Sequence, residues 1–87
     1  MVYFAYDAME QTVKIGFTDK SLKERLSNLR TANPHIRILG WIPGNEKNEK
    51  QLHKQFQHLH HAREWFYYRD ELKTFVRNVV NARVSAE

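Results

Sequence analysis

Apolar and aromatic residues are arranged in the first 17 positions in a way that predicts two strands. Residues Met1 to Tyr6 are nearly all apolar or aromatic, which is typical of a strand buried on both faces. From Thr12 to Phe17 every second residue is apolar, which predicts a strand with one buried face. The connection, residues 7–11, is short, so we expect the two segments to form an antiparallel hairpin.

A helix is predicted to follow this hairpin and to begin at a capping box. Ser21 is placed to accept hydrogen bonds from the first amides of the helix, and Glu24 is placed to reach back to the cap. The helix is predicted to end near Arg30, ahead of an Asn-Pro pair. Its apolar stripe consists of leucines at helical spacing: Leu22, Leu26 and Leu29.

The remaining residues predict one more strand and two more helices. The third strand covers residues 36–42, and the second helix runs from about Glu46 to Leu59. The segment HHARE, residues 60–64, is predicted to be a loop. Asp70 is suited to cap a third helix, in which apolar residues recur at i, i+3, i+4 and i+7. Residues 83–87 are expected to fray.

This order of elements, β-β-α-β-α-α, predicts a single α+β domain over residues 1–82. The expected architecture is a small three-stranded antiparallel sheet flanked by three helices, which buries all the apolar stripes. A chain of 87 residues has little core to spare. Any functional site must therefore share residues with the fold.

Charge and composition narrow the classes of function. Lysine and arginine number 14 against 10 aspartate and glutamate, giving a net charge of +4, and the pI is about 9.6. This excess favours a polyanionic partner such as nucleic acid. The chain has no cysteine, which excludes a disulfide framework, a thiolate zinc site and cysteine catalysis. Without a long apolar run or a signal-peptide pattern, we expect a cytoplasmic protein that does not enter membranes.

One cation interrupts the apolar stripe of the first helix. Arg25 lies three residues after Leu22 and four before Leu29, on or beside the side expected to be buried. In one interpretation its stem is buried while the guanidinium reaches water. In the other, its donors hold a phosphate against the sheet.

The second helix carries a carboxylate on its inward side. Glu49 lies three residues before Leu52 and seven before Phe56. It either pairs with an arginine or serves as a hard oxygen ligand for a divalent cation. His53 follows one turn later on the same face, but this pair alone lacks the third ligand of a zinc site.

Three residues of the two N-terminal strands are also candidates. Lys14 projects away from its apolar neighbours, where it is either solvated or a donor to a phosphate oxygen. Gly16 inside a strand indicates a bend or a close approach of the backbone. Tyr3 and Tyr6 project to opposite faces, so at least one of them is expected in the core.

Taken together, these segments resemble the GIY-YIG nuclease superfamily, and most closely its compact phage and bacterial branch, often labelled a DNA-binding domain of a phage open reading frame. The resemblance covers about residues 2–76. It rests on short motifs in a fairly specific order: VYF, VKIGFT, SLKERLSNL, NP, EKQLHKQF and REWF.

The resemblance implies a site for phosphodiester hydrolysis. Tyr3 matches the tyrosine of the first motif, Gly16 the glycine of the second, and Arg25 the arginine of the first helix. Glu49 matches the glutamate that binds one divalent metal ion, here Mg²⁺ or Mn²⁺. His53 matches a histidine that is frequent in this branch.

Lys14 departs from the superfamily, because it stands where the second motif carries its tyrosine. The implied catalytic residues are Tyr3, Lys14, Arg25, Glu49 and His53. The residues expected to contact nucleic acid are Lys14, Lys20, Lys23, Arg25 and Arg30.

The implied activity is that of a metal-dependent DNA endonuclease or nickase, acting as a monomer or homodimer without a small-molecule cofactor. Tyr3 would serve as general base, Arg25 would clamp the phosphate, and the metal ion at Glu49 would stabilise the growing charge. Two alternatives stay open. One is a nucleic-acid-binding module of the same fold that does not cleave, and the other is a protein-interaction factor, such as a phage antagonist of a host enzyme, that uses the stretch HLHHAREWFYY.

Overall fold

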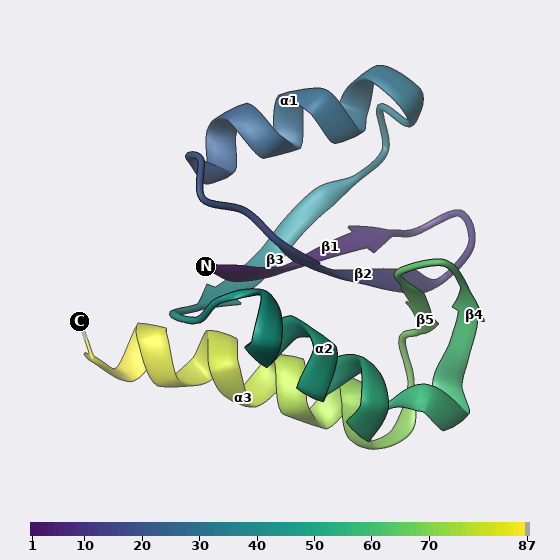
Figure 1. The fold of residues 1–87 in the computed structure, drawn as a ribbon, viewed down its shortest axis with the longest axis vertical. Coiled ribbons are helices and arrows are strands. Elements are labelled where there is room, and N and C mark those ends of the chain that lie inside the picture. Colours follow the sequence, from purple (N-terminus) through teal and green to yellow (C-terminus); the bar gives the residue numbers. More distant parts are fainter. Residues whose placement is uncertain (87) are drawn as a thin grey trace.

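A central sheet lies between one helix on one face and two helices on the other (Figure 1). The computed structural model describes the backbone of residues 1–86 and the side chains of residues 1–82. The prediction that residues 83–87 fray concerns residues whose side chains are not described. The strands are β1 (Val2–Asp7), β2 (Thr12–Phe17), β3 (Arg37–Ile42), β4 (His60–Ala62) and β5 (Trp65–Tyr67). The helices are α1 (Leu22–Ala32), α2 (Glu46–Gln55), the 3-10 helix η1 (Gln57–Leu59) and α3 (Asp70–Ala86).

The sheet has five antiparallel strands in the order β3-β1-β2-β5-β4, so the predicted three-stranded sheet is wrong, although the α+β class holds. Both missed strands lie in residues 60–67, where a loop was predicted at 60–64. Each has only three residues, too few to reveal a period of two, and all three residues of β4 are exposed. The element order is therefore β-β-α-β-α-β-β-α.

Local sequence signals explain where the first two helices begin. At α1, the Ser21 side chain accepts a hydrogen bond of 3.1 Å from the Glu24 amide, as predicted. At α2, the cap is Asn45, whose side chain accepts from the amides of Lys47 and Asn48 while the Asn48 side chain accepts from the Asn45 amide. The predicted second helix was too long, because α2 ends at Gln55 and η1 follows it.

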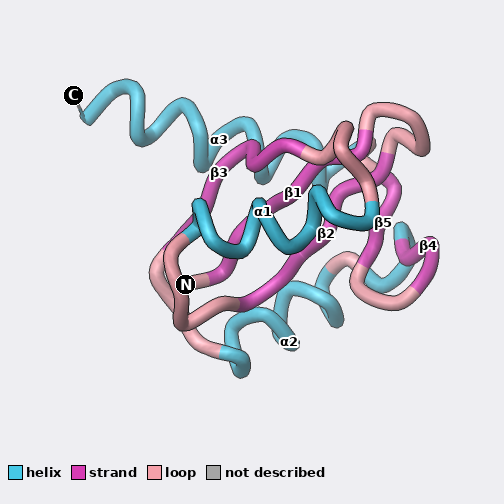
Figure 2. Tube along the Cα trace, turned by 90° about the horizontal axis from the view of Figure 1, so that it is seen from above, coloured by secondary structure: helices cyan, strands magenta, loops and turns pink. Residues whose placement is uncertain are grey.

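Alternate residues of β1 are buried on opposite faces of the sheet. Val2 and Phe4 belong to the larger core cluster, to which α2 contributes Leu52, the end of α2 contributes its C-cap residue Phe56, and α3 contributes Leu72 and Val76. Tyr3 and Ala5 belong to a smaller cluster, against which the leucines of α1 pack. Figure 2, seen from the α1 side, shows α1 over β1 and β2. The residues predicted for the site, Tyr3 and Lys14, lie on this α1 face.

Candidate functional site

The ring of Tyr3 lies over Gly16 on the neighbouring strand. The two residues are direct partners in the β1–β2 register. A Cβ atom added to Gly16 would collide with Cζ and Oη of the Tyr3 ring. This confirms that Gly16 marks a close approach, and its physical cause is the tyrosine ring beside it.

Arg25 reaches back from α1 to this buried ring. Its Nε donates a hydrogen bond of 2.9 Å to Oη of Tyr3, and Tyr3 is 0% exposed. The hydrogen bond with Tyr3 raises the pKa of Arg25 above its ordinary value, against an opposing effect of burial. The charges of Glu64 and Glu49 act in the same direction as the hydrogen bond. The guanidinium is therefore anchored to the sheet and lies within the field of two carboxylates.

Lys14 is not the solvated surface residue that its place in the strand allowed. Its Nζ lies 3.1 Å from Oε2 of Glu64, and its side chain is only 13% exposed. Glu64 belongs to the turn between β4 and β5, and its carbonyl accepts a hydrogen bond of 3.1 Å from the Ile15 amide. The β2–β5 pairing therefore brings this carboxylate to Lys14.

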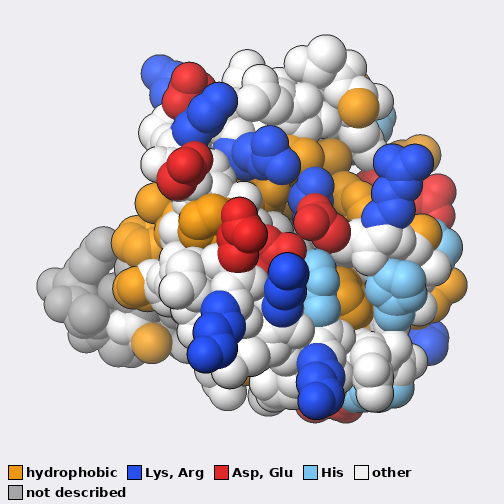
Figure 3. All heavy atoms as spheres, viewed as in Figure 1, with side chains coloured by type: hydrophobic (Ala, Val, Ile, Leu, Met, Phe, Trp, Pro, Cys, Tyr) orange, Lys and Arg blue, Asp and Glu red, His pale blue; other side chains and the backbone are white. Residues whose placement is uncertain are grey.

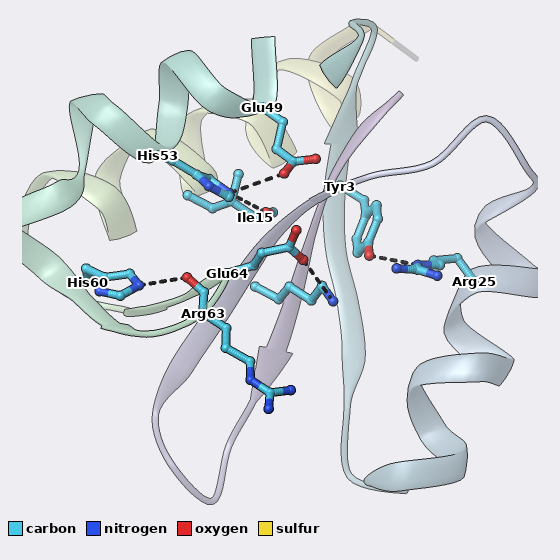
Figure 4. A network of polar contacts seen from close by, with 9 residues as sticks. Tyr3, Ile15, Arg25, Glu49, His53, His60, Arg63 and Glu64 are labelled. Carbon is cyan, nitrogen blue, oxygen red and sulfur yellow. Dashed lines mark hydrogen bonds and ion pairs between the residues drawn. The ribbon is translucent and has the colours of Figure 1, made fainter. Parts of the chain in front are cut away.

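Glu49 enters the same region from the first turn of α2. Its side chain is 12% exposed, and burial is the main cause that raises its pKa above the ordinary value. The neighbouring carboxyl group of Glu64 raises this pKa further, by its charge and by a hydrogen bond, while His53 acts in the opposite direction. Figure 4 shows the two carboxyl groups converging, with Tyr3 and Arg25 beyond them.

His53 connects α2 to the sheet. Its Nε2 lies 2.7 Å from the carbonyl oxygen of Ile15, and since a carbonyl only accepts, this nitrogen carries the proton. The same nitrogen is 3.7 Å from Oε1 of Glu49, and the ring packs against Phe66 with centroids 5.1 Å apart. His53 therefore ties α2 to β2, and its ring lies beside the Glu49 carboxylate.

The donor set suits a hard divalent cation better than zinc. Among residues 1–82, no three or more histidine, aspartate or glutamate side chains are grouped as a metal site requires. Glu49 and Glu64 instead offer carboxylate oxygens only. Mg²⁺ keeps several water ligands and commonly binds to one or two carboxylates together with substrate phosphates, so the residues present fit Mg²⁺ or Mn²⁺.

The cations expected to contact nucleic acid are in three different situations. Lys14 and Arg25 belong to the network just described, whereas Lys20 and Lys23 are exposed beside it and on α1. Arg30 uses its Nε to donate to the carbonyl of Ile36 at 2.9 Å. Figure 3 shows further basic side chains over α2, next to the acidic ones. Three lysines of α2 that the sequence-based set omitted are exposed and line an open hollow on its outer side: Lys47, Lys50 and Lys54.

The structure thus brings together all five residues expected to be catalytic, and it adds Glu64. The sequence offered one signal for Glu64, its place in the motif REWF. The motif does not reveal that Glu64 faces Lys14, because that depends on pairing between β2 and the unpredicted strand β5. The α2 lysines had a plainer signal, since positions 47, 50 and 54 follow helical spacing.

Comparison with known protein families gives a match over nearly the whole chain. A sequence model described as the T5orf172 domain matches residues 1–83. This is a family of nuclease-like, DNA-binding domains from phage open reading frames. No curated protein and no solved structure matches the chain. Within the described part of the chain, no helix combines the length and apolar character needed to cross a membrane.

Proposed function

The chain belongs to the T5orf172 domain family, and on this premise we propose that it is a metal-dependent DNA endonuclease or nickase of the GIY-YIG type. One observation carries the proposal: two anchored cations, Arg25 and Lys14, and two carboxylates, Glu49 and Glu64, come from four different elements to one region. Such a combination suits a phosphodiester, whose negative charge increases during hydrolysis.

The guanidinium of Arg25 is suited to bind the phosphate with two parallel hydrogen bonds. Its Nε is occupied by Oη of Tyr3, which leaves the two terminal amino groups for a bidentate contact with phosphate oxygens. Lys14 adds a second positive charge from β2. Because both side chains are held by protein partners, they lose little freedom when the phosphate arrives.

Glu49 is the residue that would hold the divalent cation. When bound, Mg²⁺ or Mn²⁺ supplies stabilisation of the charge that develops on the phosphate and the leaving oxygen. Glu49 projects from the first turn of a helix and is fixed beside His53 at 3.7 Å, so its carboxylate is held on a rigid element. The second carboxylate, Glu64, disfavours ionisation of Glu49 in the protein alone, and a cation held by Glu49 would favour its ionised form.

We assign Tyr3 an orienting role in place of the general base expected from the resemblance. A base must reach the attacking water within hydrogen-bond distance. The Tyr3 side chain has no exposed surface, and Nε of Arg25 already occupies its oxygen. Tyr3 therefore serves the reaction by fixing the direction of the Arg25 fork.

The second candidate is a DNA-binding module that does not cleave. It is favoured by the same burial of Tyr3, together with Lys14 at the position of the superfamily's second tyrosine, because neither side chain then offers a water-accessible base. The protein-interaction alternative receives no such support. Its proposed contact stretch, HLHHAREWFYY, includes the buried Leu59 and Phe66, which are 3% and 1% exposed.

Incubation of supercoiled plasmid with the protein and Mg²⁺ or Mn²⁺ tests the proposal. Wild type is expected to produce nicked or linear plasmid, and Glu49→Gln is expected to lose at least about 100-fold in rate. Glu10→Gln, which removes an exposed carboxylate from the turn after β1, is the matched control and should cleave normally. Plasmid that stays supercoiled with the wild type, while binding to DNA persists, would favour the module that does not cleave.

A further inference from the structure

The turn between β4 and β5 presents the carboxylate of Glu64 to the site. The resemblance assigned no role to this residue. Glu64 lies within ion-pair distance of Lys14, at 3.1 Å, and its carboxyl group points toward that of Glu49 (Figure 4). We infer that Glu64 is a positioning residue of the cleavage site, which holds the Lys14 ammonium where an incoming phosphate will meet it. This inference rests on the proposed function.

Backbone contacts of the β4–β5 hairpin hold the turn that contains Glu64 in place. Arg63, in the turn, adopts a left-handed conformation with φ of 51°, which is uncommon for a residue with a side chain. Nε2 of His60 lies 2.7 Å from the Arg63 carbonyl and donates to it, and the Ile15 amide donates to the Glu64 carbonyl. Figure 4 shows the contact between His60 and Arg63. The turn is therefore held both within the hairpin and to β2.

Lys14 depends on such a partner for its direction. A lysine stem has four methylene groups, and its ammonium is strongly hydrated, so an unpaired Lys14 would turn toward water. In the structure the side chain is largely buried, and Trp65 is its direct neighbour in the β2–β5 register. The Glu64 carboxylate compensates the buried ammonium and keeps it on the α1 face of the sheet.

If Glu64 acted only through its negative charge, it would weaken the binding of DNA. Glu64 is 43% exposed and adds a negative charge near the expected path of a polyanion. Neutralising it should therefore leave DNA affinity unchanged or increase it. A loss of cleavage in the same variant then requires that Glu64 acts on the geometry of the site, and a general loss of structure would instead weaken both properties.

Four proteins decide the question: wild type, Lys14→Met, Glu64→Gln and the double variant, with Glu10→Gln as the control for removal of one carboxylate. Single-turnover cleavage at saturating plasmid, DNA affinity in EDTA and urea unfolding are measured for each. We expect Glu64→Gln to cleave on the order of 10- to 100-fold more slowly, with affinity equal to or tighter than wild type. The double variant should be no slower than Lys14→Met, and the urea midpoints should be non-additive.

The inference is overturned if Glu64→Gln cleaves at the wild-type rate, if the double variant loses the product of the two single losses, or if the urea midpoints are additive. A wild-type protein that leaves DNA intact refutes the proposed function instead. In that case the unfolding cycle of the same four proteins still decides whether Glu64 and Lys14 are coupled.

Discussion

Arg25 and Tyr3 form one unit across two elements: the guanidinium of a helix donates at 2.9 Å to the hydroxyl of a fully buried tyrosine on β1, an interior strand of the sheet. The arginine that interrupts the leucine stripe of α1 is therefore directed toward the sheet. Its Cζ lies 6.0 Å from the centre of the Tyr3 ring, so the ring also contributes a cation–π contact. Because Tyr3 occupies only Nε, the two terminal amino groups of the guanidinium stay available for a ligand.

Removal of the Tyr3 hydroxyl should affect cleavage more than stability. Tyr3→Phe keeps the ring but removes the acceptor for Arg25, which costs about 1 kcal/mol of unfolding free energy because the partly exposed guanidinium recovers water. Cleavage should fall on the order of 10- to 100-fold, since Arg25 loses its direction. Urea unfolding and plasmid cleavage measure the two effects. Tyr6→Phe, on the other face of β1, is the control, and equal cleavage by the two variants would contradict the orienting role.

The close contact at Gly16 makes a separate prediction about stability. Gly16→Ala forces a methyl group into the Tyr3 ring, so we expect a loss of about 1–3 kcal/mol in unfolding free energy. Gly40→Ala is a matched control, because a Cβ there would lie 3.3 Å and 3.6 Å from methyl groups of Val80 and Val79, without a collision. Chemical denaturation of the two variants provides the comparison. Equal losses would show that the Tyr3 ring moves away without cost.

The shape of the Arg25 side chain should matter as much as its charge. Arg25→Lys keeps one positive charge, but it cannot donate to Tyr3 and bind a phosphate with two parallel hydrogen bonds. We expect cleavage to drop on the order of 100-fold, with a smaller change in DNA affinity. Arg77→Lys, the same exchange at an exposed position of α3, is the control. Cleavage by Arg25→Lys at the wild-type rate would mean that only charge is required.

Glu49 should make the metal-free protein less stable as pH rises. Its pKa is raised in the folded protein, mainly by burial and then by Glu64, so the folded state binds the proton more tightly than the unfolded state. This contribution is therefore present at low pH and is lost as pH rises through the pKa of the folded protein. In EDTA, Glu49→Gln should be more stable than wild type at pH 7, and the difference should shrink toward the acid range. Glu10→Gln should show no such trend in thermal unfolding; an identical pH profile for Glu49→Gln and wild type would contradict the prediction.

The sequence predicted the parts of the fold that have clear periodicity. Val13 and Ile15 alternate with polar residues, and the leucines of α1 follow helical spacing, so β2 and α1 were found within two residues of their ends. The strands β4 and β5 have three residues each, and pairing alone defines them. A pattern along the chain does not record which strands pair.

The site residues likewise divide into those that one segment of the sequence reveals and those that depend on contacts between distant segments. Arg25 and Glu49 were found because each places a charge on an apolar helix face, which is visible in one segment. Glu64 was missed because its meaning depends on Lys14, 50 positions earlier, across the β2–β5 pair. The burial of Tyr3 agrees with the predicted strand buried on both faces, but its hydrogen bond to Arg25 was beyond the sequence, since it results from α1 packing on the sheet.

Manganese binding followed by electron paramagnetic resonance tests the metal site most directly. Free Mn²⁺ is titrated with wild type, Glu49→Gln and Glu10→Gln at neutral pH, with a short duplex present and then absent. Wild type and Glu10→Gln are expected to bind one ion, more tightly with the duplex, while Glu49→Gln loses this binding. Equal Mn²⁺ affinity for wild type and Glu49→Gln would contradict the assignment of Glu49 as the residue that holds the cation.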